Sequence, residues 1–414
     1  MAKAKTEKKK FRIAFVEYFL NLQLEGGSMF SLDLYARELI KRGHDISVLT
    51  ITSKRNDLGR ERKLYRMIEE NCNNSNPIIL DKEAQRIMQK YEGQFDFYHV
   101  HNPWLLPAAA AYRKNGGKAP VVADLNTYMF CTNFAVMDGE CHKSCGLYKR
   151  VIHSDFPVLK KLASIPVRAY QQHGLDILGK YVDRFFPVSP FAEKIFVEYG
   201  LPKEKMMMIP DGFDLNVFRA SGVTRHLTSR VSTFNIICPS RFDYTKGVDI
   251  AVKAVAELKN RGISNINLHI VGNDGSEKGN IMKLTDELRL SNCIIFHGHL
   301  TLKQLLFIYS NCQLFVHPAR WFETFGRTII EAMAFGLPCV VSSKGALSWV
   351  ADGGGLVFES GNAADLADKI EKIYKDEKLR ASLSKKALVR VKDFDVKYTI
   401  DGFEKAYEKL FKDK

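Results

Sequence analysis

The sequence predicts an α/β protein with two domains, each built on a doubly wound parallel sheet. Three observations predict this fold class. The chain of 414 residues is too long for one ordinary hydrophobic core and is sufficient for two. Strand-like and helix-like segments alternate along it in two successive series. A turn-rich stretch at residues 211–233 separates the two series and marks the expected domain boundary.

The first series begins with a strand at 11–15, followed by a loop that contains Gly26 and Gly27. Apolar residues then recur at helical spacing up to Gly43, and a strand follows at 46–51. This strand–helix–strand order is a βαβ unit, which predicts a parallel sheet. Further strands of the first domain are expected at 97–100, 121–125, 184–188 and 206–209.

The second series repeats this alternation and ends in a charged amphipathic helix. Its strands are expected at 234–238, 266–271, 293–296, 314–317 and 338–342, and its helices at 248–258 and 329–335. The predicted organisation is a basic disordered tail (1–10), an N-terminal domain (11–218), a C-terminal domain (219–394) and a final helix (395–414) that packs back towards the N-terminal domain. Both domains are expected to be Rossmann-like. Such sheets bind ligands beyond the carboxyl ends of their strands, so the cleft between the domains is the expected site.

Composition indicates a soluble globular protein, with 46% hydrophobic and 26% charged residues. No apolar run approaches the roughly 18 residues that span a bilayer. The apolar stretch after the basic residues 1–10 is short and carries Arg12 and Glu17, which is not typical of a signal peptide. We therefore expect a cytoplasmic protein. The net charge of +14 is compatible with anionic lipid or phosphorylated substrates, but no recognised motif indicates nucleic acid as a partner.

The eight cysteines fit a reducing compartment. Four lie in strand-like runs and are expected to be small buried hydrophobes: Cys238, Cys293, Cys312 and Cys339. Cys131, Cys141 and Cys145 cluster beside His142 but lack a paired C-x-x-C pattern and a clear fourth ligand. Free thiols or a local disulfide are favoured there over a metal site.

Two glutamates lie eight residues apart in the segment 315–342. Glu323 falls in the loop after a predicted strand and Glu331 on the first turns of the next helix. Gly326 lets the backbone approach a ligand, and the helix start offers N–H groups to a phosphate. Carboxylates beside an anion site suit sugar or ribose hydroxyls, which donate hydrogen bonds to them. For Glu331 alone, an ordinary acidic helix start is the simpler explanation.

Two cations lie in the loop at 239–247, between a predicted strand and helix. Arg241 and Lys246 would sit at the carboxyl edge of the sheet, where they can neutralise a diphosphate. A leaving diphosphate gains negative charge in the transition state, so cations at this place would accelerate its departure. Either residue alone would be interpreted as a solvated surface cation.

Together these residues closely resemble the signature of retaining GT-B glycosyltransferases of glycosyltransferase family 4. The matching positions are Arg241, Lys246, Gly247, Glu323, Phe325, Gly326, Glu331 and Ala332. Four further segments agree with the family in order and spacing: the glycine loop at 26–27, the strand end at 96–101, the loop at 209–214 and the glycine loop at 271–275. The resemblance covers nearly the whole chain, and the ordered set is specific.

The resemblance implies transfer of a hexose-type sugar from a nucleoside-diphosphate sugar to an acceptor hydroxyl. It implies retention of the anomeric configuration, with no metal ion and no other cofactor. Arg241 and Lys246 would stabilise the donor diphosphate, Glu323 would contact the transferred sugar and Glu331 would bind the ribose hydroxyls. The remaining implied substrate-binding residues are Gly26, Gly27, Gly272, Phe325, Gly326 and Arg327. The D-x-D at 393–395 lies away from these motifs.

One position departs from the family pattern. Many members carry a histidine just after the strand that corresponds to 121–125, where this chain has Asn126. Asn126 can hydrogen-bond a sugar hydroxyl but cannot transfer a proton at neutral pH. His101 follows a neighbouring predicted strand, and we expect it in the cleft as a catalytic residue together with Asn126. For His99, a packed histidine is at least as plausible.

The acceptor is expected to be a lipid-linked group or a saccharide. Residues 143–180 combine basic with apolar side chains, which is typical of a segment that docks on an anionic membrane surface. Pro157 and Pro166 interrupt a continuous helix, which favours the alternative to membrane docking. In that alternative the apolar side chains pack into the domain core and the basic side chains face solvent. A nucleotide-sugar epimerase or a non-catalytic binding protein with the same architecture remains the alternative function.

Overall fold

The computed structural model describes residues 9–22, 27–52, 56–58, 64–72, 77–128, 165–166, 169, 177–220, 233–272, 274–298 and 300–413. The chain divides into two compact units. The N-terminal unit is Met1–Gly212 with Val396–Lys414, and the C-terminal unit is Phe213–Asp395. The division falls at residue 212, where the sequence predicted 218. Phe213 belongs to the C-terminal unit because its N–H donates to Phe394 O and its backbone bridges Asp395.

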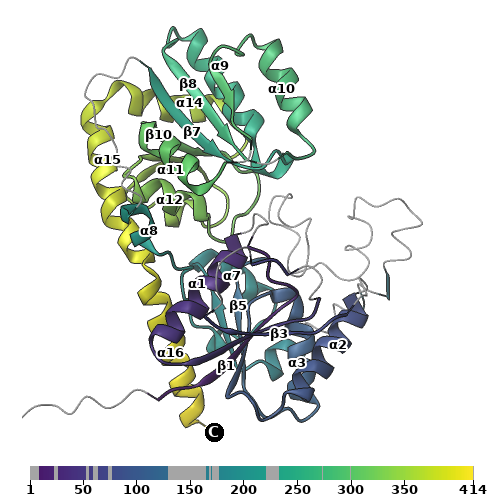
Figure 1. The fold of residues 1–414 in the computed structure, drawn as a ribbon. Helices are drawn as coiled ribbons and strands as arrows, with labels where there is room; N and C mark the ends of the chain where they lie inside the picture. Colours follow the sequence, from purple (N-terminus) through teal and green to yellow (C-terminus); the bar gives the residue numbers. More distant parts are fainter. Residues whose placement is uncertain are drawn as a thin grey trace, which may run out of the picture. The chain divides into compact units, whose positions relative to one another are not determined.

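The N-terminal unit is a six-stranded sheet in the order β3-β2-β1-β4-β5-β6, with every pair parallel (Figure 1). Its strands are β1 (Arg12–Glu17), β2 (Asp45–Thr50), β3 (Arg66–Glu69), β4 (Phe97–Val100), β5 (Val121–Leu125) and β6 (Arg184–Pro187). Its helices include α1 (Gly27–Lys41), α2 (Pro77–Lys90), α3 (Leu106–Lys114), α7 (Pro190–Glu198) and α16 (Val396–Lys412). The order reverses between β1 and β4, so right-handed crossovers place α1 and α3 on opposite faces of the sheet.

The strand predicted at 206–209 does not form. This segment runs beside β6 and donates from Met207 to Phe185 O and from Ile209 to Pro187 O. It makes a single bridge, between Phe185 and Met206. The next bridge would need an N–H from Pro187, and proline has none, so the ladder stops.

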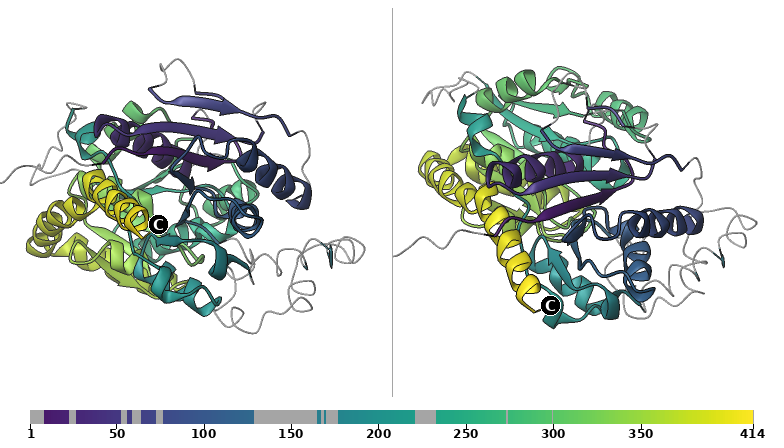
Figure 2. Two further views of the ribbon diagram at one scale, coloured as in Figure 1. Left: turned by 90° about the horizontal axis from the view of Figure 1, so that it is seen from below. Right: turned by 60° about the horizontal axis from the view of Figure 1, so that its bottom comes forward.

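The last helix of the chain completes the core of the N-terminal unit. α16 packs against α1, beside which it runs in Figure 2. Ile400, Phe403 and Tyr407 on its inner face join the core that contains Phe11 and Tyr35. These apolar residues recur at three- and four-residue spacing, which explains why a strongly charged segment is held as a helix on the sheet.

The C-terminal unit repeats the same architecture with its own six-stranded parallel sheet, in the order β12-β11-β10-β7-β8-β9. Its strands are β7 (Phe234–Pro239), β8 (Ile266–Val271), β9 (Ile294–Phe296), β10 (Leu314–His317), β11 (Cys339–Ser342) and β12 (Gly355–Phe358). Its helices are α8 (Leu215–Ala220), α9 (Val248–Asn260), α10 (Lys278–Glu287), α11 (Leu302–Asn311), α12 (Arg327–Ala334), α13 (Leu347–Val350), α14 (Ala363–Lys375) and α15 (Glu377–Arg390). These two sheets confirm the predicted α/β fold class.

The four cysteines that were predicted to be buried are free and buried: Cys238, Cys293, Cys312 and Cys339. The cluster of Cys131, Cys141, Cys145 and His142 lies outside the described residues, as do residues 1–8 of the predicted tail and Gly26. In the part of the chain that the structure describes, no helix combines the length and the apolar character needed to cross a bilayer.

Candidate active site

The C-terminal unit brings two predicted loops together at the point where its strand order reverses. β7 and β10 are hydrogen-bonded neighbours, so the loops that follow them start side by side at the carboxyl edge of the sheet. Gly247, after β7, has φ +66°, and a Cβ there would lie 2.1 Å from Pro318 O, after β10. Only glycine permits this close approach of the two loops.

The loops meet through an ion pair. Lys246 Nζ lies 2.5 Å from Glu323 Oε1, with both side chains largely buried. Burial alone would raise the pKa of Glu323, but the charge of Lys246 and the neighbouring His317 lower it well below its usual range. Glu323 is therefore a carboxylate with one oxygen engaged by a cation.

A second ion pair joins the loop after β10 to the first turn of α9, which follows the loop after β7. Arg320 donates to both carboxylate oxygens of Asp249, at 2.6 and 2.7 Å. The backbone N–H groups of Arg320 and Trp321 both donate to Thr245 O, at 2.9 and 3.0 Å. These bonds fix the backbone on either side of the Lys246–Glu323 pair, which preorganises it for a ligand.

Helix α12 starts directly after the second loop. Its N-cap is Gly326, with φ +106° and no side-chain cap hydrogen bond, so the first turn can offer N–H groups to an anion. Glu331 lies in its second turn and accepts a hydrogen bond from Tyr309 Oη at 3.0 Å. Burial raises the pKa of Glu331, and the charge of Arg327 partly opposes that rise. The ring of Phe325 is buried among other aromatic rings, so only its backbone is placed to face a ligand.

Two predicted residues border this centre. Arg241 is 63% exposed and pairs with Asp243 at 3.3 Å, which leaves its guanidinium at the surface of the loop after β7. A Cβ on Gly272, after β8, would lie 2.2 Å from Ser240 O. The glycine thus lets the loops after β7 and β8 pack closely, in addition to any role toward a donor.

In the N-terminal unit, His101 follows β4 as predicted, but its ring is buried and fully engaged. Nδ1 lies 2.6 Å from Asp124 Oδ2, and Nε2 lies 2.7 Å from Ser28 O at the start of α1. Asn126 donates from Nδ2 to His101 O at 3.2 Å and to Ser28 Oγ at 3.3 Å. His99 is also buried, between Asp124 and α16, so it is a packed histidine.

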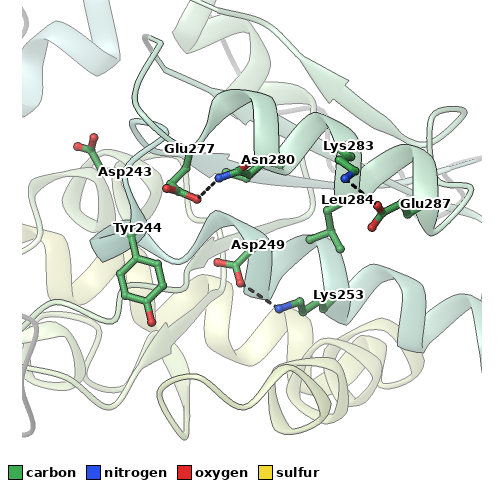
Figure 3. A pocket seen from close by; sticks show the side chains of 10 residues that line it. Asp243, Tyr244, Asp249, Lys253, Glu277, Asn280, Lys283, Leu284 and Glu287 are labelled. Atoms are coloured by element: carbon green, nitrogen blue, oxygen red, sulfur yellow. Dashed lines mark hydrogen bonds and ion pairs between the residues drawn. The ribbon is translucent and has the colours of Figure 1, made fainter.

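A hollow of about 320 Å³ in the C-terminal unit lies between α9 and α10, beside the loop after β7 (Figure 3). Four carboxylates line it, against two lysines: Asp243, Asp249, Glu277 and Glu287 face Lys253 and Lys283. A lining with more carboxylates than cations disfavours a diphosphate. None of the residues predicted to bind the donor lines this hollow.

Several residues at the centre were not anticipated from the sequence. In the C-terminal unit, His317 ends β10 beside Glu323, and Arg320 pairs with Asp249. In the N-terminal unit, Asp124 contacts His101. For His317, Arg320 and Asp124, a position at or just after the end of a predicted strand was the available signal; Asp249 lies in the first turn of a predicted helix and gave none. Among the described residues, no group of three or more His, Cys, Asp or Glu side chains could hold a metal ion.

Comparison with known proteins covers both units. The family model "Glycosyltransferase Family 4" matches residues 26–217, and the model "Glycosyl transferases group 1" matches residues 226–390. Mannosylfructose-phosphate synthase of Agrobacterium fabrum is 26% identical over 393 residues, which cover 89% of this chain and 80% of the relative. D-inositol 3-phosphate glycosyltransferase of Paenarthrobacter aurescens is 26% identical over 322 residues, which cover 76% and 72%.

Two solved structures share the fold. Sucrose-phosphate synthase from Thermosynechococcus elongatus superposes with a TM-score of 0.74 at 20% identity, covering 98% of this chain and 100% of that one. HepE from Anabaena, solved in complex with UDP, superposes with a TM-score of 0.71 at 18% identity, covering 96% and 100%. The two family models and the paired Rossmann-like sheets lead to one conclusion: the chain belongs to family 4 of the glycosyltransferases, the glycosyl transferases group 1, and is a GT-B enzyme that uses a nucleotide-sugar donor.

Proposed function

We propose that this glycosyltransferase moves a hexose-type sugar from a nucleoside-diphosphate sugar to an acceptor hydroxyl, with retention of the anomeric configuration and without a metal ion. The observation that carries the proposal is the buried Lys246–Glu323 pair at the strand-order reversal of the C-terminal unit. It offers a cation for a diphosphate and a carboxylate for sugar hydroxyls within one contact.

In the proposed reaction, the bond between the anomeric carbon and the diphosphate oxygen breaks. Lys246 and Arg241 stabilise the charge that develops on the diphosphate, and the first turn of α12 adds N–H groups. The acceptor oxygen bonds to the anomeric carbon on the same face. Its proton passes to the departing phosphate oxygen, so no protein base is required. Glu331 binds the ribose hydroxyls in this proposal.

The relatives suggest which substrates to test first. HepE has been solved with UDP-glucose, which makes UDP-glucose the first donor to test. Mannosylfructose-phosphate synthase and D-inositol 3-phosphate glycosyltransferase carry phosphorylated small molecules in their names, which supports a saccharide or related polyol acceptor. A lipid-linked acceptor and an anionic membrane surface remain predictions, because most of residues 143–180 lies outside the described part of the chain.

A donor screen tests the function. Purified protein is incubated with UDP-, GDP- and ADP-sugars, with candidate acceptors and with EDTA, and the nucleoside diphosphate and the product linkage are measured. We expect one donor to be consumed in EDTA, with a product of the donor's anomeric configuration. Loss of turnover in EDTA that a divalent ion restores would refute the metal-independent mechanism. Epimerised sugar without transfer, or binding without release, would refute the transferase function.

Two variants test the site. Lys246→Ala and Glu323→Ala should each lose about 10²- to 10³-fold in kcat, because each removes a preorganised charge from the transition state. Lys375→Ala is the matched control, since Lys375 also pairs with a glutamate at 2.5 Å but on the exposed surface of α14. Near-normal turnover in both site variants would refute the assignment.

A further inference from the structure

His317 presents a buried hydrogen-bonding atom that the proposed mechanism has not used. It is the last residue of β10, is 6% exposed and lies directly beneath the loop that carries Glu323. Within the described residues its Nε2 is buried without a hydrogen-bond partner. Glu323 Oε1 lies 3.5 Å from it, which is at the long limit for a hydrogen bond. A buried polar group that lacks a hydrogen-bond partner destabilises the folded protein.

The other side of the ring fixes its orientation. His317 Nδ1 lies 3.3 Å from Thr328 Oγ1, at the second position of α12. If the Thr328 hydroxyl donates to Nδ1, the neutral ring carries its proton on Nε2, which is then a donor directed at Glu323. The ring needs no charge to act in this way.

The protein contacts only one of the two carboxylate oxygens of Glu323 among the described residues. Its Oε1 receives Lys246 at 2.5 Å and faces His317, and no hydrogen bond to its Oε2 occurs among the described residues. One oxygen is thus anchored by the protein and the other can accept from a ligand hydroxyl. When a diphosphate arrives, Lys246 must be shared with it, which weakens the contact that anchors Oε1.

We propose that His317 is a positioning residue for Glu323. Its Nε2–H closes on Glu323 Oε1 when Lys246 turns to the donor diphosphate, and it keeps Oε2 directed at a hydroxyl of the transferred sugar. Hydrogen bonds at active sites are often long without ligand and shorten in the substrate complex. The inference rests on the proposed function and assigns to the same site a third residue, which contacts neither the nucleotide nor the diphosphate.

Two variants separate a donor at Nε2 from a packing role. His317→Gln can place an amide N–H near the position of Nε2, whereas His317→Leu fills similar space without a donor. His269→Leu is the control, since His269 is a half-buried histidine of the same unit, on β8, that contacts His297 and Asn235. Each protein is measured for melting temperature, for UDP and UDP-glucose binding by calorimetry, and for kcat and KM with the donor that wild type consumes.

We expect His317→Leu to lower kcat by about 10- to 100-fold, because it removes one hydrogen bond to a charged group at the reacting centre. Its affinity for UDP should stay within about twofold of wild type, since UDP carries no sugar for Glu323 to contact. Its melting temperature should equal or exceed that of wild type, because an unsatisfied buried N–H is gone. His317→Gln should recover most of kcat, and His269→Leu should keep it.

Three outcomes would overturn the role of His317: an unchanged kcat in His317→Leu, equal losses in the Gln and Leu variants, or a loss of kcat that merely follows a lower melting temperature. If wild type releases no nucleoside diphosphate from any donor, the proposed function itself fails. The wild-type measurement therefore distinguishes the two failures.

Discussion

Replacing Asp124 by Asn should destabilise the N-terminal unit more than any surface change. The Asp124 carboxylate bridges His99 Nε2 at 3.0 Å and His101 Nδ1 at 2.6 Å. His101 Nε2 lies 2.7 Å from Ser28 O, which can only accept, and 3.0 Å from Ser28 Oγ, which can donate or accept. The shorter contact, to the carbonyl oxygen, favours a donor at Nε2 as well as at Nδ1. His101 is therefore a buried imidazolium, and Asp124 is its counter-charge.

The pKa directions agree with this protonation state. Burial alone would lower the pKa of His101, but the hydrogen bond and charge of Asp124, with the charge of Glu17, raise it above its ordinary 6.5. Burial alone would raise the pKa of Asp124, but His99 and His101 lower it from 3.8 to about 2. The contribution of His101 to stability is complete below pH 6.5 and is lost as pH rises through its raised pKa. That of Asp124 is present above pH 3.8 and is lost as pH falls towards 2.

The magnitude follows from burial. Removing one partner of a buried charged pair costs about 3–5 kcal/mol, because the other charge is left uncompensated. In Asp124→Asn the amide also turns an N–H₂ group towards a histidine that is already donating. For a unit of this size, each kcal/mol lowers the melting temperature by roughly 2–4 °C, so we expect a fall of about 6–20 °C near pH 6.

Calorimetry from pH 5 to 9, with hydrogen exchange of the β4 and β5 amides, measures the effect in the N-terminal unit. The second readout is needed because a chain of two units need not unfold in one step. Asp401→Asn is the control: Asp401 also faces a cation, Arg42, but is 56% exposed, and such pairs contribute at most about 1 kcal/mol. Equal melting temperatures for Asp124→Asn and wild type at pH 6 would refute the argument, as would a wild-type stability that does not decline above pH 6.5.

Three other predictions follow from single contacts. Gly247→Ala should lower kcat at least about tenfold in initial-rate assays, because its Cβ would meet Pro318 O and part the two site loops. Arg42→Ala should loosen α16, because it leaves the buried Glu404 without the cation at 2.9 Å; faster proteolysis of the C-terminus would show this, and an unchanged rate would contradict it. Glu331→Gln should weaken UDP binding by about tenfold in calorimetry without lowering the melting temperature, because a buried carboxylate with a raised pKa is replaced by a neutral amide. Unaltered affinity would remove the ribose role.

The sequence by itself determined the fold class and the places of most strands and helices, including the two loops that carry the proposed donor-site residues. An apolar run bounded by glycine indicates a strand, and apolar residues at helical spacing after it indicate a helix. Both signals are local, so they do not depend on where the strand lies in the sheet. Gly247 and Gly326 could be recognised in the sequence as positions where the backbone turns sharply, since glycine is the residue that turns of this kind select. In the structure both have positive φ values, which other side chains disfavour. Even the missing strand at 206–209 has a local cause, since Pro187 offers no N–H.

Only the tertiary structure decided which of these residues touch. Lys246 and Glu323 are 77 positions apart, and they meet because β10 pairs with β7 rather than with β9, which precedes it in the chain. Hydrophobic period specifies that a strand is buried but not which strand lies beside it, because many strand orders bury the same side chains. The sequence placed His101 just after a strand, but only the structure showed that Asp124 and Ser28 contact its two ring nitrogens, beside a small hollow that His101 and Asn126 line. Hydrogen-bond partners of this kind come from other elements of the fold, and the order of residues along one strand does not reveal them.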